Sequence, residues 1–190
     1  MPPDLTRQEY ERTLALLRDR RITGVVYHPL TGGAEGLDVE DWDFGPWHQP
    51  TMGVELLTDD GARFSAVWGD SFDHYGLEVF PGPIGNHLAG IGKPYGPAAV
   101  DVTRHPGWAN LIHQPLTGLE IAWTDGMEGK LELPVAIRLR SARGTVWIAA
   151  GRPAEPPSDD RYRLATNDVM VLFTADLAVA TGLSTLPTHP

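Results

Sequence analysis

The stretch "MGVELLTDDGARFSAVW", residues 52–68, carries the clearest fold signal in the chain. Two apolar, β-prone runs flank Asp60-Gly61, a dipeptide typical of a tight turn between antiparallel strands. A second stretch of this kind, "LPVAIRLRSARGTVWIAA", covers residues 133–150 around "SARG". The sequence therefore predicts two β-hairpins, one in each half of the chain.

The elements expected around the two hairpins follow the same order. Thr6 and Glu9 form a T-x-x-E capping box, which predicts a helix over residues 6–20. Gly24 is the glycine expected to end it. The strand "ITGVVY" follows it, and the strand "YGLEVF" follows the first hairpin. In the second half we expect a short helix at 105–112, strands at 116–123 and 168–173, and a last helix at 175–183.

The two halves also align locally. Leu17, Ile22, Thr23 and Gly24 match Leu111, Leu116, Thr117 and Gly118 without a gap. Around the hairpins, the gapless matches are Val54 with Ile137, Leu56 with Leu139, Gly61 with Gly144 and Phe64 with Trp147. Agreement of both order and spacing favours an internal duplication, although two segments of this kind can also look alike by chance.

These patterns predict an α+β, β-rich fold with few short helices. Two similar helix-strand-hairpin-strand halves would pack as a sandwich, a curved sheet or an open barrel, because neither half alone buries both faces of its sheet. We expect one domain over 1–190. It would comprise a half at 4–80, a Gly/Pro-rich linker at 81–100, a half at 101–183 and a tail at 184–190.

Composition restricts the class of protein. The chain has 190 residues, a formal net charge of −10 and no cysteine, which fits a reducing cytosol and excludes thiolate chemistry. No secretory signal and no apolar run long enough to span a bilayer is evident, so we expect a cytoplasmic location and no membrane contact. Basic residues form no stripe, which argues against nucleic-acid binding, and the acidic charge suits a basic protein partner.

The connection "VWGDSFDHYG", residues 67–76, holds the weak catalytic candidates Asp70, Asp73 and His74. A carboxylate beside an imidazole can support general-base chemistry. No nucleophile motif accompanies them, and short polar side chains after a strand commonly bond to backbone in turns. We favour the turn interpretation, and enzyme status stays open with a preference for a non-enzyme.

The loop "DWDFGPWHQP", residues 41–50, supplies the candidate binding residues. These are Asp41, Trp42, Asp43, Trp47 and His48, to which we add Tyr75. Exposed tryptophans can anchor a protein interface or stack on a planar ligand, whereas buried ones would form a small core that fixes the loop. Both interpretations remain open at this stage.

Metal and cofactor sites are not predicted. None of the six histidines considered has H-x-H or H-x-x-x-H spacing: His28, His48, His74, His87, His105 and His113. A metal site would therefore have to combine distant segments, for instance His48 with Asp70 and His74.

The segments "HPGWANLIHQPLTGLEIAWTD", "PVAIRLRSARGTVWIAAGRP" and "NDVMVLFT" resemble a pattern in small uncharacterised bacterial proteins of actinomycete type, and residues 52–80 resemble their partner segment. The resemblance implies a stand-alone cytoplasmic module with no established activity. We expect a non-catalytic acidic module of immunity or adaptor type that binds through the aromatic-acidic loop. The alternative is a small-molecule-binding or catalytic β-barrel that uses the 70–74 cluster with the 41–48 loop.

Overall fold

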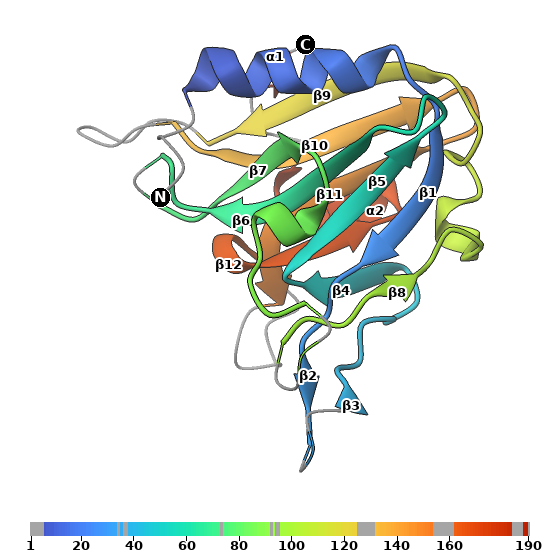
Figure 1. Ribbon diagram of the computed structural model, residues 1–190. Helices are drawn as coiled ribbons and strands as arrows, with labels where there is room; N and C mark the ends of the chain where they lie inside the picture. Colours follow the sequence, from blue (N-terminus) through green and yellow to red (C-terminus); the bar gives the residue numbers. More distant parts are fainter. Residues whose placement is uncertain are drawn as a thin grey trace.

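Two antiparallel sheets form the framework of the protein (Figure 1). The computed structural model describes residues 6–33, 35, 38–72, 74–91, 93, 96–124, 132–153, 162–183 and 188–189. The first sheet has the order β7-β6-β5-β1-β8, and the second has the order β13-β9-β10-β11-β12-β4. A separate ribbon pairs β2 with β3.

The bounds of the elements are as follows. The first half contains α1 (Arg7–Arg18), β1 (Ile22–Tyr27), β2 (Thr31–Gly32), β3 (Asp38–Val39), β4 (Trp47–Thr51), β5 (Gly53–Thr58), β6 (Arg63–Gly69) and β7 (Gly76–Pro81). Between the halves lie the 3₁₀-helix η1 (Ile84–Asn86) and β8 (Val100–Asp101). The second half contains the 3₁₀-helix η2 (Pro106–Trp108), β9 (Leu116–Trp123), β10 (Pro134–Ser141), β11 (Thr145–Pro153), β12 (Tyr162–Leu172), α2 (Ala175–Ala180) and β13 (Thr188–His189).

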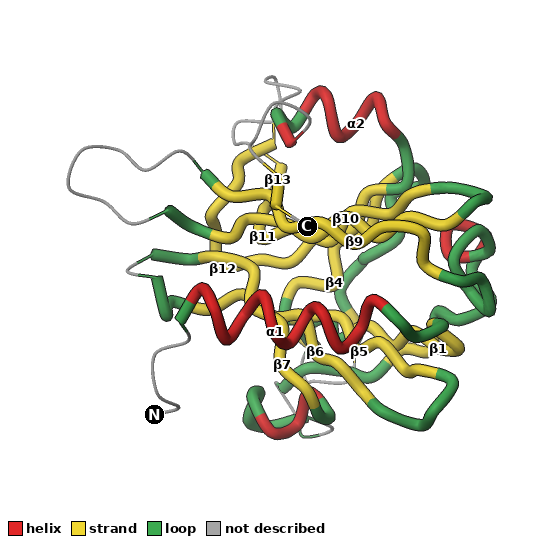
Figure 2. Tube along the Cα trace, turned by 90° about the horizontal axis from the view of Figure 1, so that it is seen from above, coloured by secondary structure: helices red, strands yellow, loops and turns green. Residues whose placement is uncertain are grey.

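The two sheets pack face to face over one hydrophobic core, and neither sheet closes into a barrel among the described residues. Strands β10, β11 and β12 lie against β6 and β7. Helix α1 crosses the open side of this sandwich above β7 and β9 (Figure 2), where it buries Tyr10, Leu14 and Leu17. Helix α2 packs on β12. The prediction of a β-rich fold with few helices is confirmed.

Local sequence signals explain the first helix and hairpin. Glu9 N–H donates to Thr6 Oγ1, and Thr6 N–H donates to Glu9 Oε2, so the capping box is formed. In the hairpin, Leu56 pairs with Phe64, and Gly61 has φ +82°, a conformation that glycine adopts without strain. Gly24 lies inside β1 rather than at a helix end, because α1 already ends at Arg18.

The first strand pair of each half shares an irregularity. Ile22 pairs with Thr58 and Gly24 with Leu57, so Thr23 is the extra residue of a β-bulge. In the second half, the same shift separates the pairs Leu116–Ser141 and Gly118–Arg140, and the extra residue is Thr117. The "[I/L]TG" tripeptides that align in sequence therefore have the same place in the register of their sheets.

The gapless alignment of the hairpins is wrong at its last position. Leu139 pairs with Val146, and Trp147 lies opposite Arg138. The second hairpin turn is thus one residue shorter than the first. Because neighbouring residues of a strand face opposite sides, the buried Val146 is the counterpart of the buried Phe64, and Trp147 is only half-buried.

Part of the predicted loop at 41–50 is strand β4, which pairs with β12 at the edge of the second sheet. The chain then crosses to β5 in the first sheet through Met52. Thr51, immediately before this crossing, has φ +53°, which redirects the backbone between the two layers. This crossing places residues 41–48 at the seam between the sheets.

Among the described residues, neither helix has the length and apolar character that a bilayer crossing requires.

Candidate functional site

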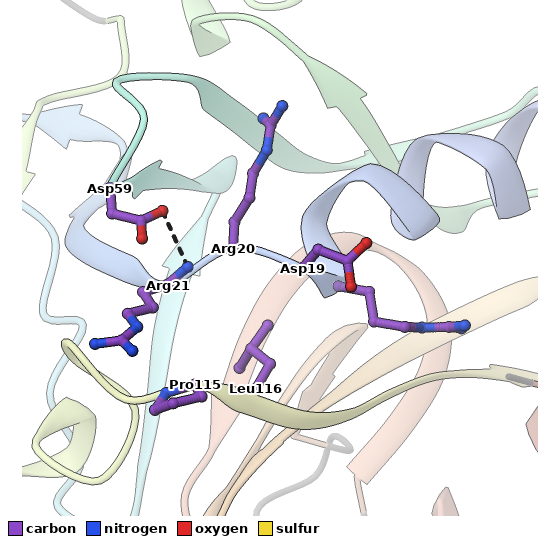
Figure 3. A pocket seen from close by; sticks show the side chains of 7 residues that line it. Asp19, Arg20, Arg21, Asp59, Pro115 and Leu116 are labelled. Atoms are coloured by element: carbon purple, nitrogen blue, oxygen red, sulfur yellow. Dashed lines mark hydrogen bonds between the residues drawn. The ribbon is translucent and has the colours of Figure 1, made fainter.

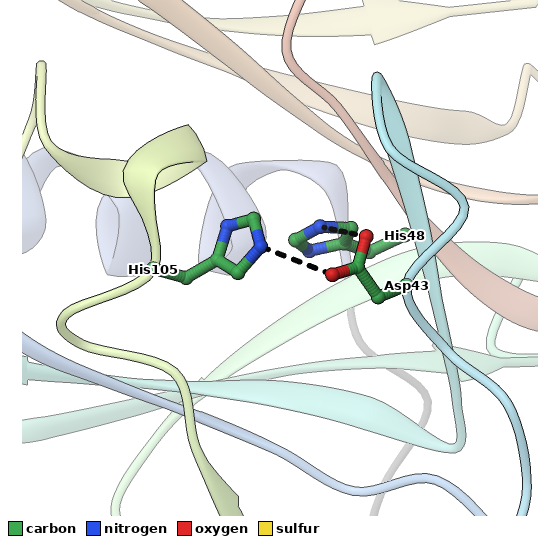
Figure 4. Close-up of side chains that lie close together, drawn as sticks. All are labelled: Asp43, His48 and His105. Carbon is green, nitrogen blue, oxygen red and sulfur yellow. Dashed lines mark hydrogen bonds and ion pairs between the residues drawn. The ribbon is translucent and has the colours of Figure 1, made fainter.

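Asp43, His48 and His105 bring their side chains together at this seam (Figure 4). Asp43 lies in the loop before β4, His48 is the second residue of β4, and His105 directly precedes η2. Each residue offers one ligand atom, and these atoms lie within 4.8 Å of one another. Two separate backbone segments, the 41–48 loop and the residue before η2, therefore converge on one small polar cluster.

A tight turn positions the Asp43 carboxylate. Asp43 forms an antiparallel bridge with His48, and Phe44 N–H donates to the carbonyl of Trp47 at 3.1 Å. Gly45 has φ +83°, and its N–H donates to Asp43 Oδ1 at 2.9 Å. That hydrogen bond holds the pKa of the Asp43 carboxyl below its usual range, with a smaller effect of His105 in the same direction.

His48 is fully buried, and Tyr27 and Trp108 orient its ring from the Nδ1 side. Trp108 Nε1–H donates to Tyr27 Oη at 2.8 Å, and Tyr27 Oη lies 2.8 Å from His48 Nδ1. Because Tyr27 Oη already accepts from Trp108, its hydroxyl proton is free to be donated to His48 Nδ1, which leaves the proton of the neutral imidazole on Nε2. His48 Nε2 lies 3.3 Å from Asp43 Oδ1, out of line for a hydrogen bond, and so has no hydrogen-bond partner.

Burial determines the charge of His48. The rings of Trp42, Tyr27 and Phe173 meet its ring edge to face, with centroids 4.6–5.5 Å away. Loss of solvent lowers the pKa of His48 to about 4, and the neighbouring His105 acts in the same direction. His48 is therefore neutral at physiological pH.

His105 forms the other side of the cluster. Its Nε2 lies 3.2 Å from Asp43 Oδ2, and its Nδ1 accepts a hydrogen bond from Gly107 N–H at 3.1 Å, which caps η2. The proton of neutral His105 is consequently on Nε2. Moving it to Nδ1 would leave Gly107 N–H without an acceptor, at a cost of about 1–3 kcal/mol.

The outer side of the same loop presents aromatic and acidic groups. Phe44 stacks on Trp47 with centroids 4.5 Å apart, and Phe44 remains 46% exposed. Trp42, by contrast, packs inward against Tyr27 and His48. Trp42 therefore helps to fix the loop, as the buried interpretation expects, whereas Phe44 and part of Trp47 face outward.

The 67–76 connection has a different environment. Asp70 and His74 are exposed, Asp73 lies outside the described residues, and Tyr75 is 39% exposed beside Trp68. Ser71 donates to the buried Glu78 from both its N–H and its hydroxyl. These bonds agree with the turn interpretation.

Phe72 anchors this turn to the core. Its ring meets the rings of Tyr10 and Trp123. The turn therefore contacts α1 and β9, whereas the 41–48 loop contacts Tyr27, His105 and Phe173.

A pocket also lies where the two halves meet, at the bridge between Arg21 and Pro115 (Figure 3). Its lining consists of Arg18, Asp19, Arg20, Arg21, Asp59, Pro115 and Leu116. Arg20 pairs with Asp60 at 3.1 Å, and Arg21 N–H donates to Asp59 Oδ1 at 3.2 Å. Arginines and aspartates thus line the same pocket, so their charges largely offset one another.

Sequence reasoning gave no role to His105, Tyr27 or Trp108. His105 lies 57 positions after His48, and no short motif links the two. The only local signal was His105 immediately before Pro106, which marks the start of a short helix.

The chain matches no protein-family model, no curated protein and no solved structure.

Proposed function

We propose that this protein is a non-catalytic, cytoplasmic contact module of immunity or adaptor type, which binds a basic protein partner. Residues 38–47 form the contact surface, termed here the 38–47 surface. The observation that carries the proposal is the stacked pair of Phe44 and Trp47 at the tip of this loop.

Exposed apolar side chains support this choice of surface. Val39 is 43% exposed and Phe44 is 46% exposed, although both belong to residue types that normally avoid water. Aromatic side chains that project from a surface are typical anchors of protein interfaces, because a partner's pocket can bury a large apolar area around them.

The charge of the surrounding sequence supports a basic partner. Asp38, Glu40, Asp41 and Asp43 are all exposed, and no lysine or arginine occurs between Arg21 and Arg63. Such a one-signed region steers an oppositely charged protein during encounter and makes association dependent on salt.

The loop is also fixed before any partner arrives. The Asp43–His105 contact, the Gly45 N–H bond and the packing of Trp42 hold its backbone from the inner side. A surface that is already ordered loses little conformational entropy on binding, so more of the contact energy appears as affinity.

We further propose that the two halves derive from one duplicated unit. The matching bulges at Thr23 and Thr117 support this, as does the antiparallel bridge between Arg21 and Pro115, which are equivalent in the gapless alignment. Leu57 lies 33 positions after Gly24, whereas Arg140 lies 22 positions after Gly118. The extra length in the first half includes the 38–47 surface, so this surface would be an addition to one copy.

Site-specific photo-crosslinking tests the contact function. A photoreactive phenylalanine analogue replaces Phe44 in one variant and Leu16 in a matched control, because Leu16 is also an exposed apolar residue (55%) but lies on α1. We expect position 44 alone to crosslink a basic protein in extracts of the source cells. The crosslinked protein is then purified and its affinity measured directly.

Asp41→Asn should weaken binding of the purified partner and reduce its salt dependence, whereas Phe44→Ala should weaken binding at every salt concentration. Equal crosslinking from positions 16 and 44 would contradict the proposal, as would a partner whose affinity is unaffected by both substitutions.

The small-molecule alternative gains no support at the 70–74 cluster. It requires a titrating His74 inside a pocket, whereas Asp70 and His74 are both exposed.

A further inference from the structure

We propose that Asp43, His48 and His105 form a binding site for a divalent transition-metal ion of the Zn²⁺ class. Two imidazole nitrogens and one carboxylate are donors that Zn²⁺ and related ions prefer, whereas Mg²⁺ and Ca²⁺ prefer oxygen-only sites. The inference goes beyond the contact function and does not depend on it.

The spacing of the donors fits such an ion. His48 Nε2 lies 3.3 Å from Asp43 Oδ1, and His105 Nε2 lies 3.2 Å from Asp43 Oδ2. In a tetrahedral site with bonds of about 2.0–2.1 Å, donor atoms are about 3.3 Å apart. These two distances involve different oxygens of Asp43, and the three ligand atoms lie within 4.8 Å of one another, so the side chains must draw closer to share one ion at the point where they converge in Figure 4.

A second observation points independently to a ligand. His48 is 0% exposed, yet its Nε2, on the side of the ring toward Asp43 and His105, has no hydrogen-bond partner. A buried polar atom left unsatisfied is uncommon in folded proteins, and an unrecorded ion is one of its recognised explanations. A metal ion between the three donors would satisfy this nitrogen.

The surroundings of the cluster resemble the outer shell of a metal site. When Nε2 of His48 binds metal, the ring proton moves to Nδ1, from which it can be donated to Tyr27 Oη at 2.8 Å. Histidine ligands commonly have such a partner behind them, because it fixes the ring and raises its basicity. Trp108 in turn holds Tyr27.

Coordination by His105 has a consequence that can be tested. Coordination through its Nε2 places the ring proton on Nδ1, where it meets the Gly107 N–H that now donates to that atom. Metal binding must therefore break the hydrogen bond that caps η2. That loss is small beside the free energy with which three such ligands hold Zn²⁺, and it gives a spectroscopic signal at a backbone group that is not itself a ligand of the ion.

The site would remain open on one side. The chain supplies three ligands, and the Asp43 side chain is 44% exposed, so solvent or a partner's side chain can complete the shell. The ion would also join the loop to residue 105, on the inner side of the turn that carries Phe44.

The test uses the full chain without an affinity tag, stripped of metal by a chelator. Isothermal titration with Zn²⁺ and visible absorption with Co²⁺ measure affinity and stoichiometry, with Mg²⁺ as the comparison ion. We expect one equivalent of Zn²⁺ and of Co²⁺ to bind, a tetrahedral-type Co²⁺ spectrum, and no saturable binding of Mg²⁺.

Asp43→Asn and His105→Ala should each weaken Zn²⁺ binding at least about 10-fold, and Tyr27→Phe by about 10-fold as an outer partner. His74→Ala, which removes an exposed histidine, is the matched control and should leave the affinity unchanged. Circular dichroism of each variant confirms that it is folded, and ¹H–¹⁵N spectra of the wild-type chain should show the Gly107 amide signal shift as Zn²⁺ is added.

The inference is overturned by the absence of a one-to-one complex, by a Zn²⁺ affinity that survives His105→Ala, or by one that falls as much with His74→Ala as with His105→Ala. A Gly107 amide that is unaffected at saturation would also contradict it, because the proposed geometry requires that hydrogen bond to break.

Discussion

Tyr27 Oη and His48 Nδ1 lie 2.8 Å apart in the buried seam between the two sheets. The same hydroxyl accepts the indole N–H of Trp108. One phenol group thus satisfies two buried polar groups from different segments, β4 and η2, and its loss should affect both.

We expect Tyr27→Phe to lower the free energy of unfolding by about 1–3 kcal/mol, because Trp108 Nε1 and His48 Nδ1 would lose their partner without access to water. Urea titration followed by tryptophan fluorescence measures the difference. Tyr75→Phe is the control, since Tyr75 is 39% exposed and should change stability by less than about 0.5 kcal/mol. Equal effects of the two substitutions would show that the buried hydroxyl is not required.

The burial of His48 predicts a pH dependence of stability in the metal-free protein. Its pKa is about 4 in the folded state and near the ordinary value of 6.5 when unfolded. The unfolded chain therefore binds this proton first as the pH falls, so the contribution is complete above about pH 6.5 and is lost progressively down to about pH 4. The loss amounts to at most about 3 kcal/mol.

Unfolding titrations between pH 7.5 and 4.5, run in parallel on wild type and His48→Gln, isolate this effect from that of the carboxylates. The stability difference between the two proteins should narrow as the pH falls. A constant difference would mean that His48 is solvated in the folded state.

In the 67–76 connection, we expect stability to depend on Phe72 rather than on the weak catalytic candidate His74. Phe72 is 6% exposed and packs between Tyr10 and Trp123, so Phe72→Ala should cost about 3–5 kcal/mol. The neighbouring His74→Ala should stay within about 0.5 kcal/mol. Thermal and urea unfolding of the two variants make the comparison. A larger effect at His74 than at Phe72 would argue for a buried role of the histidine.

Gly45 should tolerate asparagine better than alanine. Its φ of +83° lies in the left-handed region, where a Cβ costs about 1–2 kcal/mol and asparagine is accommodated more easily. No atom would obstruct an added Cβ, so the cost is conformational rather than steric. Urea titrations of Gly45→Ala and Gly45→Asn measure it. Equal losses in both variants would point to a clash instead.

Local signals predicted the strands and turns that they encode directly. The Asp60-Gly61 turn, the strand at 116–123 and the capping box of Thr6 and Glu9 are all present, because each depends on neighbouring residues. Strand β4 was missed because "WHQPT" contains a proline and no apolar alternation. Its pairing is imposed by β12, which lies more than a hundred residues further along the chain.

The candidate site was predicted only in part. Asp43 and His48 were identified because they lie in one unusual loop, whereas His105 joins them through the packing of η2 against Tyr27. No composition or spacing rule contains that contact. The one-residue difference between the two hairpin turns was equally invisible, since it changes the side of the sheet that Trp147 faces without changing its residue type.

The bridge between Arg21 and Pro115 has a consequence for the architecture of the chain. When two aligned positions pair with each other in antiparallel fashion, the local relation between their segments is a two-fold rotation, as in an isologous subunit interface. A substitution at either position therefore acts on both halves at the same point of contact. If the two halves are copies of one unit, as proposed above, the chain holds within one polypeptide the kind of contact by which separate subunits form a symmetric dimer.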